Sequence, residues 1–102
     1  MVNLPAITNR IVNEYDPEKI VLFGSRAKGN FDEESDVDLF IIKKTNDSHI
    51  ERAMKVDELF FPRDFGLDII VRTPEEVEQS YKNNFFIQDI FKNGKILYSK
   101  YA

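Results

Sequence analysis

The sequence predicts an α/β fold in which a small mixed β-sheet carries helices mainly on one face. Short apolar runs at residues 20–23, 37–42 and 67–71 are typical of buried strands. The segments around them place apolar residues three and four positions apart, as amphipathic helices do. The chain has 102 residues and contains no internal repeat, low-complexity segment or linker, so we expect a single domain spanning residues 1–102.

The first half of the chain begins with an expected helix over residues 5–15. Pro5 suits its first turn, and Asp16-Pro17 ends it because the residue before a proline disfavours the helical region. A strand over residues 19–23 follows, and then a short helix over residues 25–28. The helix residues that share one face are Ile7, Ile11, Val12 and Tyr15.

After the acidic loop of residues 31–35, a second strand is expected over residues 37–43. Ser48 and Glu51 match a capping box, which predicts a helix over residues 49–60. We expect three side chains of that helix to face the core and the helix to end before Pro62. The three inward residues are Ile50, Ala53 and Met54.

The second half of the chain is expected to contain two strands and two helices. A third strand is expected over residues 66–72, and a second capping box, Thr73 to Glu76, then predicts a helix over residues 74–83. A last helix over residues 85–93 ends at Gly94, and residues 96–98 form a short final strand.

Composition excludes several classes of function. Hydrophobic residues make up 42% and charged residues 31%, as in ordinary soluble domains, and no apolar run approaches the ~18 residues of a membrane span. The net charge is -4 and no basic run is present, so we expect no nucleic-acid partner. A small molecule or a protein side chain is the better substrate. Without cysteine or a signal pattern, the expected location is cytoplasmic.

Asp36 and Asp38 are the first candidate site residues. They lie two positions apart where the second strand begins, so their side chains point the same way and their charges repel. A divalent cation relieves that repulsion, and carboxylate oxygens suit Mg²⁺ or Mn²⁺. A solvated acidic loop accounts for residues 32–34 but not for Asp38, which has already entered an apolar strand. A calcium EF-hand loop fails because its sixth position would be Val37 instead of glycine.

Gly24 and Ser25 form the second candidate feature, a strand-to-helix turn that is close in sequence to Asp36 and Asp38. Gly24 leaves room for a phosphate near the backbone, and Ser25 offers a hydroxyl and an N–H group. Residues 24–29 also have the spacing of a Walker A loop, but the Lys and Ser/Thr that must follow are missing. Arg26 and Lys28 either contact a triphosphate or are solvated.

Asp68 is the third candidate carboxylate. It lies inside the apolar run of residues 66–71, where a charge is costly unless it is paired or bound to a metal. A capping or edge-exposed aspartate is the structural alternative. Asp64 is a rival, but it lies in the turn after Pro62.

Taken together, G-S-x-A-x-G at residues 24–29 and S-D-x-D-L at residues 35–39 resemble the signature of the DNA polymerase beta-like nucleotidyltransferase superfamily. The short chain resembles its minimal nucleotidyltransferase (MNT) domains, which include antitoxins paired with HEPN-type toxins. The resemblance implies the polymerase beta-like nucleotidyltransferase core and transfer of AMP from ATP to a hydroxyl group. It implies that Asp36, Asp38 and Asp68 are catalytic and hold two Mg²⁺ ions. Gly24, Ser25 and Arg26 would bind the nucleotide.

The same resemblance implies a helical HEPN-type toxin as partner and one of its tyrosines as acceptor. Two alternatives remain open: modification of a small molecule such as an aminoglycoside, and a non-catalytic antitoxin that neutralises by binding. The oligomeric state is not predicted. His49 is expected to be an exposed helix residue. Most of the five paired or helical phenylalanines are expected in the core, with Phe85 or Phe86 as the exception available to a partner; the others are Phe60, Phe61 and Phe91.

Overall fold

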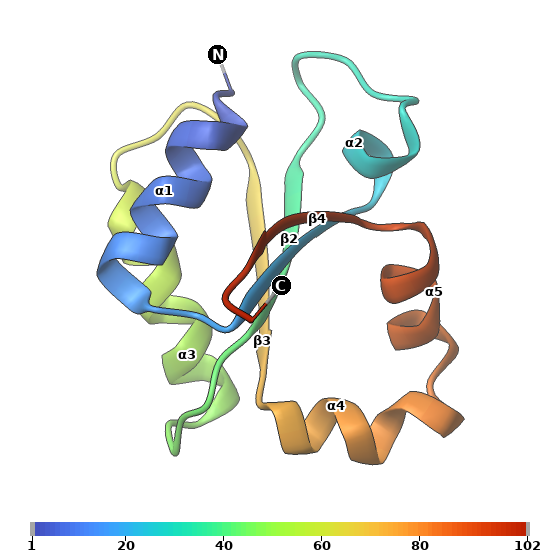
Figure 1. Ribbon diagram of the computed structural model, residues 1–102. Helices are drawn as coiled ribbons and strands as arrows, with labels where there is room; N and C mark the ends of the chain where they lie inside the picture. The colour runs from blue at the N-terminus through green and yellow to red at the C-terminus, as the bar shows by residue number, and fades with distance from the viewer. Residues whose placement is uncertain (1, 102) are drawn as a thin grey trace.

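A four-stranded mixed sheet forms the centre of the protein in the computed structural model, which describes residues 2–101 (Figure 1). The strands lie in the order β3–β2–β1–β4. β1 (Lys19–Phe23) pairs antiparallel with β2 (Val37–Ile42) and with β4 (Lys95–Ser99), whereas β2 pairs parallel with β3 (Leu67–Arg72). This arrangement confirms the predicted α/β class with a small mixed sheet. The final strand is longer than the expected residues 96–98.

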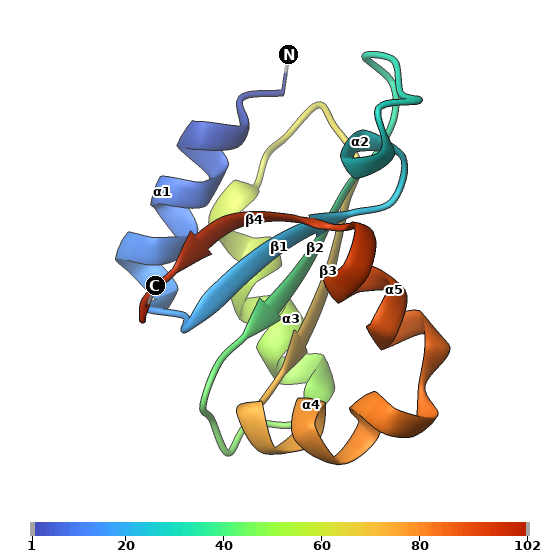
Figure 2. The ribbon, with the colours of Figure 1, turned by 45° about the vertical axis from the view of Figure 1, so that its right-hand side comes forward.

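Helices cover the two faces of the sheet unequally (Figure 2). α1 (Leu4–Tyr15) and α3 (His49–Asp57) lie on one face, and α5 (Phe85–Asn93) packs on the other. The short helix α2 (Ser25–Lys28) lies at one end of the sheet, and α4 (Pro74–Ser80) lies at the opposite end.

Two expected helices end in tighter turns than their patterns predicted. The chain continues from α3 into the 3₁₀ turn η1 (Glu58–Phe60) and from α4 into the 3₁₀ turn η2 (Tyr81–Asn83). The residues expected to be helical are thus nearly all in helical turns, and only the type of the last turn differs.

The core divides into two layers because side chains alternate along each strand. Val37, Leu39 and Ile41 are buried on the face that α1 and α3 cover. Phe40 points the opposite way and joins a second cluster with Val21 and two buried isoleucines of α5, Ile87 and Ile90. Even-numbered residues of β2 and β3 therefore belong to the α5 face, and this places Asp38 and Asp68 there.

Side-chain caps fix the starts of α1, α3, α4 and α5, but not that of α2. Both predicted capping boxes are formed: Ser48 with Glu51 at α3, and Thr73 with Glu76 at α4. The backbone N–H of Gly94 donates to the carbonyl of Ile90 at 2.8 Å, which confirms Gly94 as the end of α5.

The inward face of α3 differs from the prediction. Ile50 and Met54 are 72% and 54% exposed, so their expected burial is wrong, and Ala53 is half-buried. Arg52 and Val56 are the buried residues of this helix. A pattern of apolar residues missed this rotation because Arg52 is buried by polar partners from three other segments.

No helix within residues 2–101 is long and apolar enough to cross a membrane.

Candidate functional site

Asp38 and Asp68, called the acidic pair below, lie side by side on adjacent parallel strands, where the register pairs them directly. Their side chains share the sheet face that α5 covers, and Asp68 is the more exposed of the two. Burial, a hydrogen bond with the Asp68 carboxyl group and the nearby charges of Asp68 and Asp36 together raise the pKa of Asp38 to about 6. Two carboxyl groups this close favour binding either a proton or a cation between them.

Asp36 lies one residue before β2, and its carboxylate packs against the backbone of Gly66. A Cβ atom on Gly66 would overlap Oδ1 of Asp36, so a larger residue could not stand there without moving the carboxylate. The backbone N–H of Val37 donates to the carbonyl of Gly66 at 2.9 Å, which joins the two segments. This role of Gly66 was not predicted from the sequence, although a glycine at the start of an apolar strand was the available signal.

The turn at Gly24 follows β1, which lies on the opposite side of β2 from β3 and Asp68. Phe23, the residue before it, pairs with Asp38 in the antiparallel register of β1 and β2. Gly24 has a φ of 76°, and a Cβ atom at this position would overlap Oδ2 of Asp38. Only glycine fits the backbone conformation and the close approach of the carboxylate. The turn and the Asp38 carboxylate are thus in direct contact.

Arg26 is 7% exposed and donates to the backbone of the acidic loop. Its Nε atom lies 3.0 Å from the carbonyl of Ser35, and Nη2 lies 3.4 Å from the carbonyl of Asp32. Its contribution to phosphate binding stays a prediction, because in this structure its guanidinium group binds carbonyls of the chain.

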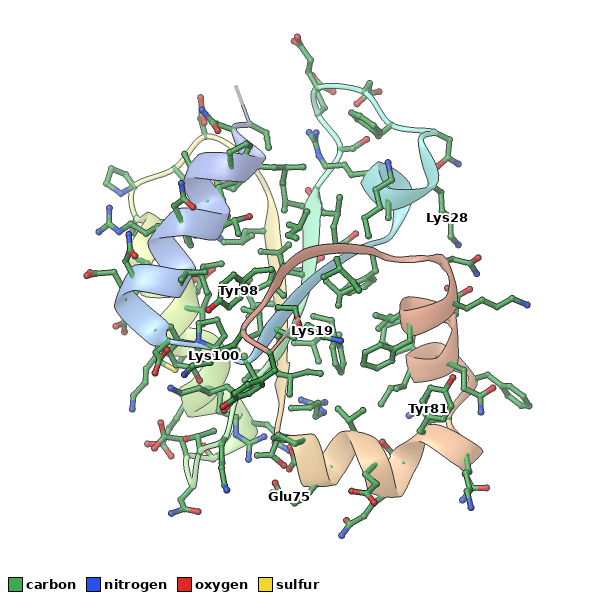
Figure 3. All side chains as sticks on the ribbon, viewed as in Figure 1. Lys19, Lys28, Glu75, Tyr81, Tyr98 and Lys100 are labelled. Carbon is green, nitrogen blue, oxygen red and sulfur yellow. The ribbon has the colours of Figure 1, made fainter. Side chains whose placement is uncertain are left out.

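Lys28 projects from α2 toward α5, where Nζ lies 4.0 Å from Oδ2 of Asp89 (Figure 3). Both side chains of this pair are about half exposed, so solvent screens the interaction.

Two aromatic side chains, Phe23 and Phe86, lie on the β1 side of Asp38. The ring of Phe23 makes an edge-to-face contact with Phe86 of α5, with the ring centroids 5.7 Å apart. Phe85 is 85% exposed and Phe86 is 51% exposed, so the exception expected at this pair applies to both residues. Phe60 and Phe91 pack against the core as expected, whereas Phe61 is exposed.

The remaining candidates lie apart from the acidic pair. Asp64 is exposed in the turn between η1 and β3. His49 is exposed, as predicted, but it has a partner that its position in the sequence did not indicate. Its Nε2 atom lies 3.0 Å from Oε2 of Glu76, beyond the far end of β3.

The donor set fits Mg²⁺. No group of three or more acidic, histidine or cysteine side chains within residues 2–101 is arranged to hold a metal ion by itself. Mg²⁺ is usually bound by one or two carboxylates together with the phosphates of a substrate, and Asp38 with Asp68 supplies that number. Burial and the neighbouring carboxyl groups of Asp68 and Asp36 raise the pKa of Asp38 and disfavour its negative charge. A cation that arrives with a nucleotide would neutralise that charge.

Comparison with known proteins identifies the family. The family model described as "Polymerase beta, Nucleotidyltransferase" matches residues 6–102, and the chain therefore belongs to this family of nucleotidyltransferases. Family membership identifies transfer of a nucleotidyl group as the class of reaction. It also confirms the family resemblance of residues 24–29 and 35–39.

Two relatives come from Methanocaldococcus jannaschii. "Putative protein adenylyltransferase MJ0604" is 33% identical over 82 residues, which cover 79% of this chain and 78% of the relative. "Putative protein adenylyltransferase MJ0141" is 31% identical over 68 residues, which cover 67% of each chain.

Solved structures share the fold at lower identity. A toxin–antitoxin complex with AMP-PNP superposes with a TM-score of 0.69 at 19% identity, covering 97% of this chain and 75% of the other. A mutant of the toxin–antitoxin pair MntA-HpeT gives a TM-score of 0.69 at 18% identity, with the same coverage. These neighbours confirm the nucleotidyltransferase fold.

Proposed function

We propose that this protein transfers AMP from ATP to a hydroxyl group of a protein partner. The observation that carries the proposal is the pairing of Asp38 with Asp68 in direct contact with the Gly24 turn. Nucleotidyl transfer needs carboxylates that hold Mg²⁺ beside a place for the triphosphate, and these three positions supply both. The relatives named as protein adenylyltransferases support AMP as the transferred group.

Each site residue has a role in this reaction. Asp36, Asp38 and Asp68 would hold two Mg²⁺ ions, which neutralise charge on the phosphates and acidify the acceptor hydroxyl. Gly24 and Ser25 would hold the β- and γ-phosphates through backbone N–H groups and the serine hydroxyl.

The bond changes are those of a simple displacement. The acceptor oxygen forms a bond to the α-phosphorus, and the bond from that phosphorus to the leaving pyrophosphate breaks. The acceptor proton passes to the carboxylate of Asp68, which lies at the exposed edge of the pair and acts as general base.

The acceptor is proposed to be a tyrosine of a HEPN-type helical toxin. Toxin–antitoxin structures among the fold neighbours, one of them with AMP-PNP, support a toxin partner and an adenine nucleotide. The net charge of -4 disfavours a nucleic-acid acceptor. Phe86 contacts Phe23, the register partner of Asp38, and the neighbouring Phe85 is exposed as well. Exposed aromatic side chains of this kind suit the anchoring of a protein partner.

Co-expression with a HEPN-type toxin, encoded in the reading frame next to that of this protein if one is present there, followed by intact-mass spectrometry, tests the proposal. We expect the partner's mass to increase by one or more AMP units, and we expect Asp36→Asn to abolish the increase. A tight complex that neutralises the toxin without any mass change, with Mg²⁺ and ATP present, would instead establish a non-catalytic antitoxin. Modification of a small molecule with no change in any protein would establish the aminoglycoside-type alternative.

A further inference from the structure

Arg26 connects the two halves of the site. It belongs to α2, directly after the Gly24-Ser25 turn, and its side chain is buried under the loop that leads to Asp36. Besides the carbonyls of Ser35 and Asp32, its Nη2 atom lies 3.5 Å from the carbonyl of Glu33. Its guanidinium carbon lies 5.0 Å from the centroid of the Phe31 ring.

The loop that Arg26 binds is held together by hydrogen bonds among its own residues. The N–H of Asp32 donates to Oγ of Ser35 at 3.1 Å, and the N–H of Ser35 donates to the carbonyl of Asp32 at 3.2 Å. The N–H of Glu34 donates to Oδ1 of Asp32 at 2.9 Å. Residues 32–35 therefore form one compact turn, and Arg26 attaches that turn to α2.

Asp36 lies between two anchored backbone groups. The carbonyl of Ser35, on its N-terminal side, accepts from Arg26, and the N–H of Val37, on its C-terminal side, donates to Gly66. A single residue between two fixed points has little freedom to move. The direction of the Asp36 carboxylate therefore depends on the contact between Arg26 and Ser35.

We propose that Arg26 is a positioning residue that fixes Asp36 relative to the Gly24-Ser25 turn. The inference rests on the proposed function, because it assumes that Asp36 takes part in binding Mg²⁺ with ATP. It also assigns Arg26 a task other than contact with the triphosphate. A planar guanidinium group can reach several carbonyls in a fixed geometry, whereas the ammonium group of lysine cannot.

The test compares Arg26→Lys with a matched variant, Arg52→Lys. Arg52 is equally buried, and its Nε atom also donates to a loop carbonyl, that of Asp47, at 2.8 Å. It lies by Glu76, beyond the opposite end of β3 from Asp68. Both substitutions keep the positive charge but replace the planar guanidinium group by an ammonium group. An effect that comes only from a general loss of stability would therefore appear in both variants.

Two readouts are measured on the full chain: ATP affinity by calorimetry across a Mg²⁺ titration and in EDTA, and amide hydrogen exchange. For Arg26→Lys we expect the Mg²⁺ concentration at half-maximal ATP binding to rise about tenfold or more, as for other residues that orient metal ligands. ATP affinity in EDTA should stay unchanged. The amides of Ser35 and Val37 should exchange faster. Arg52→Lys should change neither readout at this site.

Two results would overturn the inference. If Arg26→Gln lowers ATP affinity in EDTA while Arg26→Lys preserves it, Arg26 is a phosphate ligand through its charge. If Arg26→Lys lowers only the melting temperature, as Arg52→Lys does, Arg26 is merely structural.

Failure of the proposed function itself would look different. Wild-type protein would then show no effect of Mg²⁺ on ATP binding. The exchange of the Ser35 and Val37 amides would still decide whether Arg26 holds the loop: faster exchange in Arg26→Lys supports the attachment, and unchanged exchange refutes it.

Discussion

The two ends of β3 gather charged side chains in opposite ways. At its beginning, Asp68 lies beside Asp38, and burial together with the like charge raises the pKa of Asp38 to about 6. Just beyond its end, Glu76 lies 2.6 Å from Nη1 of Arg52 and 3.0 Å from Nε2 of His49. Burial would raise the pKa of Glu76, but hydrogen bonds from Arg52, the Thr73 N–H group and His49 outweigh it and lower the pKa to about 2.

The two ends therefore differ in whether the protein itself neutralises the carboxylate. At the Glu76 end the carboxylate pairs with Arg52 and His49, and the cap of α4 is part of the same network through Thr73. At the Asp68 end the charges that act on Asp38 are those of Asp68 and Asp36, which have the same sign, so a cation bound there would be favoured. Folding places such a pair there at a cost in stability, and a bound cation relieves that cost.

The largest effect that separates the two ends is expected from Asp38→Asn. This change should abolish nucleotidyl transfer because it removes a Mg²⁺ ligand, while the melting temperature at pH 7 stays unchanged or rises as the repulsion is relieved. Asp68→Asn should also abolish transfer but retain some nucleotide binding. Transfer is measured by intact mass of the partner, and Glu34→Gln, an exposed acid of the same region, is the control. Near-normal turnover of Asp38→Asn would contradict the proposed roles of the carboxylates.

The opposite pattern is expected from Glu76→Gln. Loss of this carboxylate leaves the buried Arg52 without its charged partner, so the free energy of unfolding should fall by about 1–3 kcal/mol. Nucleotide binding should not change, because the acidic pair lies at the other end of the strand. Urea denaturation measures the stability. Glu75→Gln, in the same turn of α4 (Figure 3), is the matched control and should have little effect.

The pH dependence of stability should differ in sign between the two ends. For Asp38 the folded-state pKa lies above the ordinary 3.8, so the folded state holds a proton between about pH 4 and pH 6 that the unfolded state has lost. Its contribution to stability is fully present below pH 3.8 and is lost as the pH rises through about 6. For Glu76 the folded-state pKa is lowered from 4.5, so its contribution is present above pH 4.5 and is lost as the pH falls through about 2.

Asp38→Asn should therefore gain stability relative to wild type as the pH rises from 4 to 7. We expect a relative gain of about 1 kcal/mol, since solvent screens a carboxyl group that is partly exposed. Denaturation curves of both proteins at several pH values measure it. A constant difference across this range would mean that the environment of Asp38 does not favour its protonated form.

The sequence predicted the site better where periodicity decides than where long-range contacts decide. Both capping boxes were predicted from local patterns and are formed. The pairing of Asp38 with Asp68 was not predicted, because it depends on the parallel register of β2 and β3. The burial of Arg52 could not be predicted, because its partners come from residues 47, 71 and 76. The roles of Arg26 and Gly66 depend on contacts of the same long-range kind with the loop before β2.

Calorimetric titration of ATP into the protein, with Mg²⁺ and with EDTA, is the most direct test of the acidic pair as a cation-dependent nucleotide site. The account predicts an affinity about tenfold or more higher with Mg²⁺, because the cation joins the phosphates to Asp38 and Asp68. It predicts that Asp38→Asn, still folded by its melting curve, loses this difference. Equal affinity of the wild-type protein in Mg²⁺ and in EDTA would contradict the account.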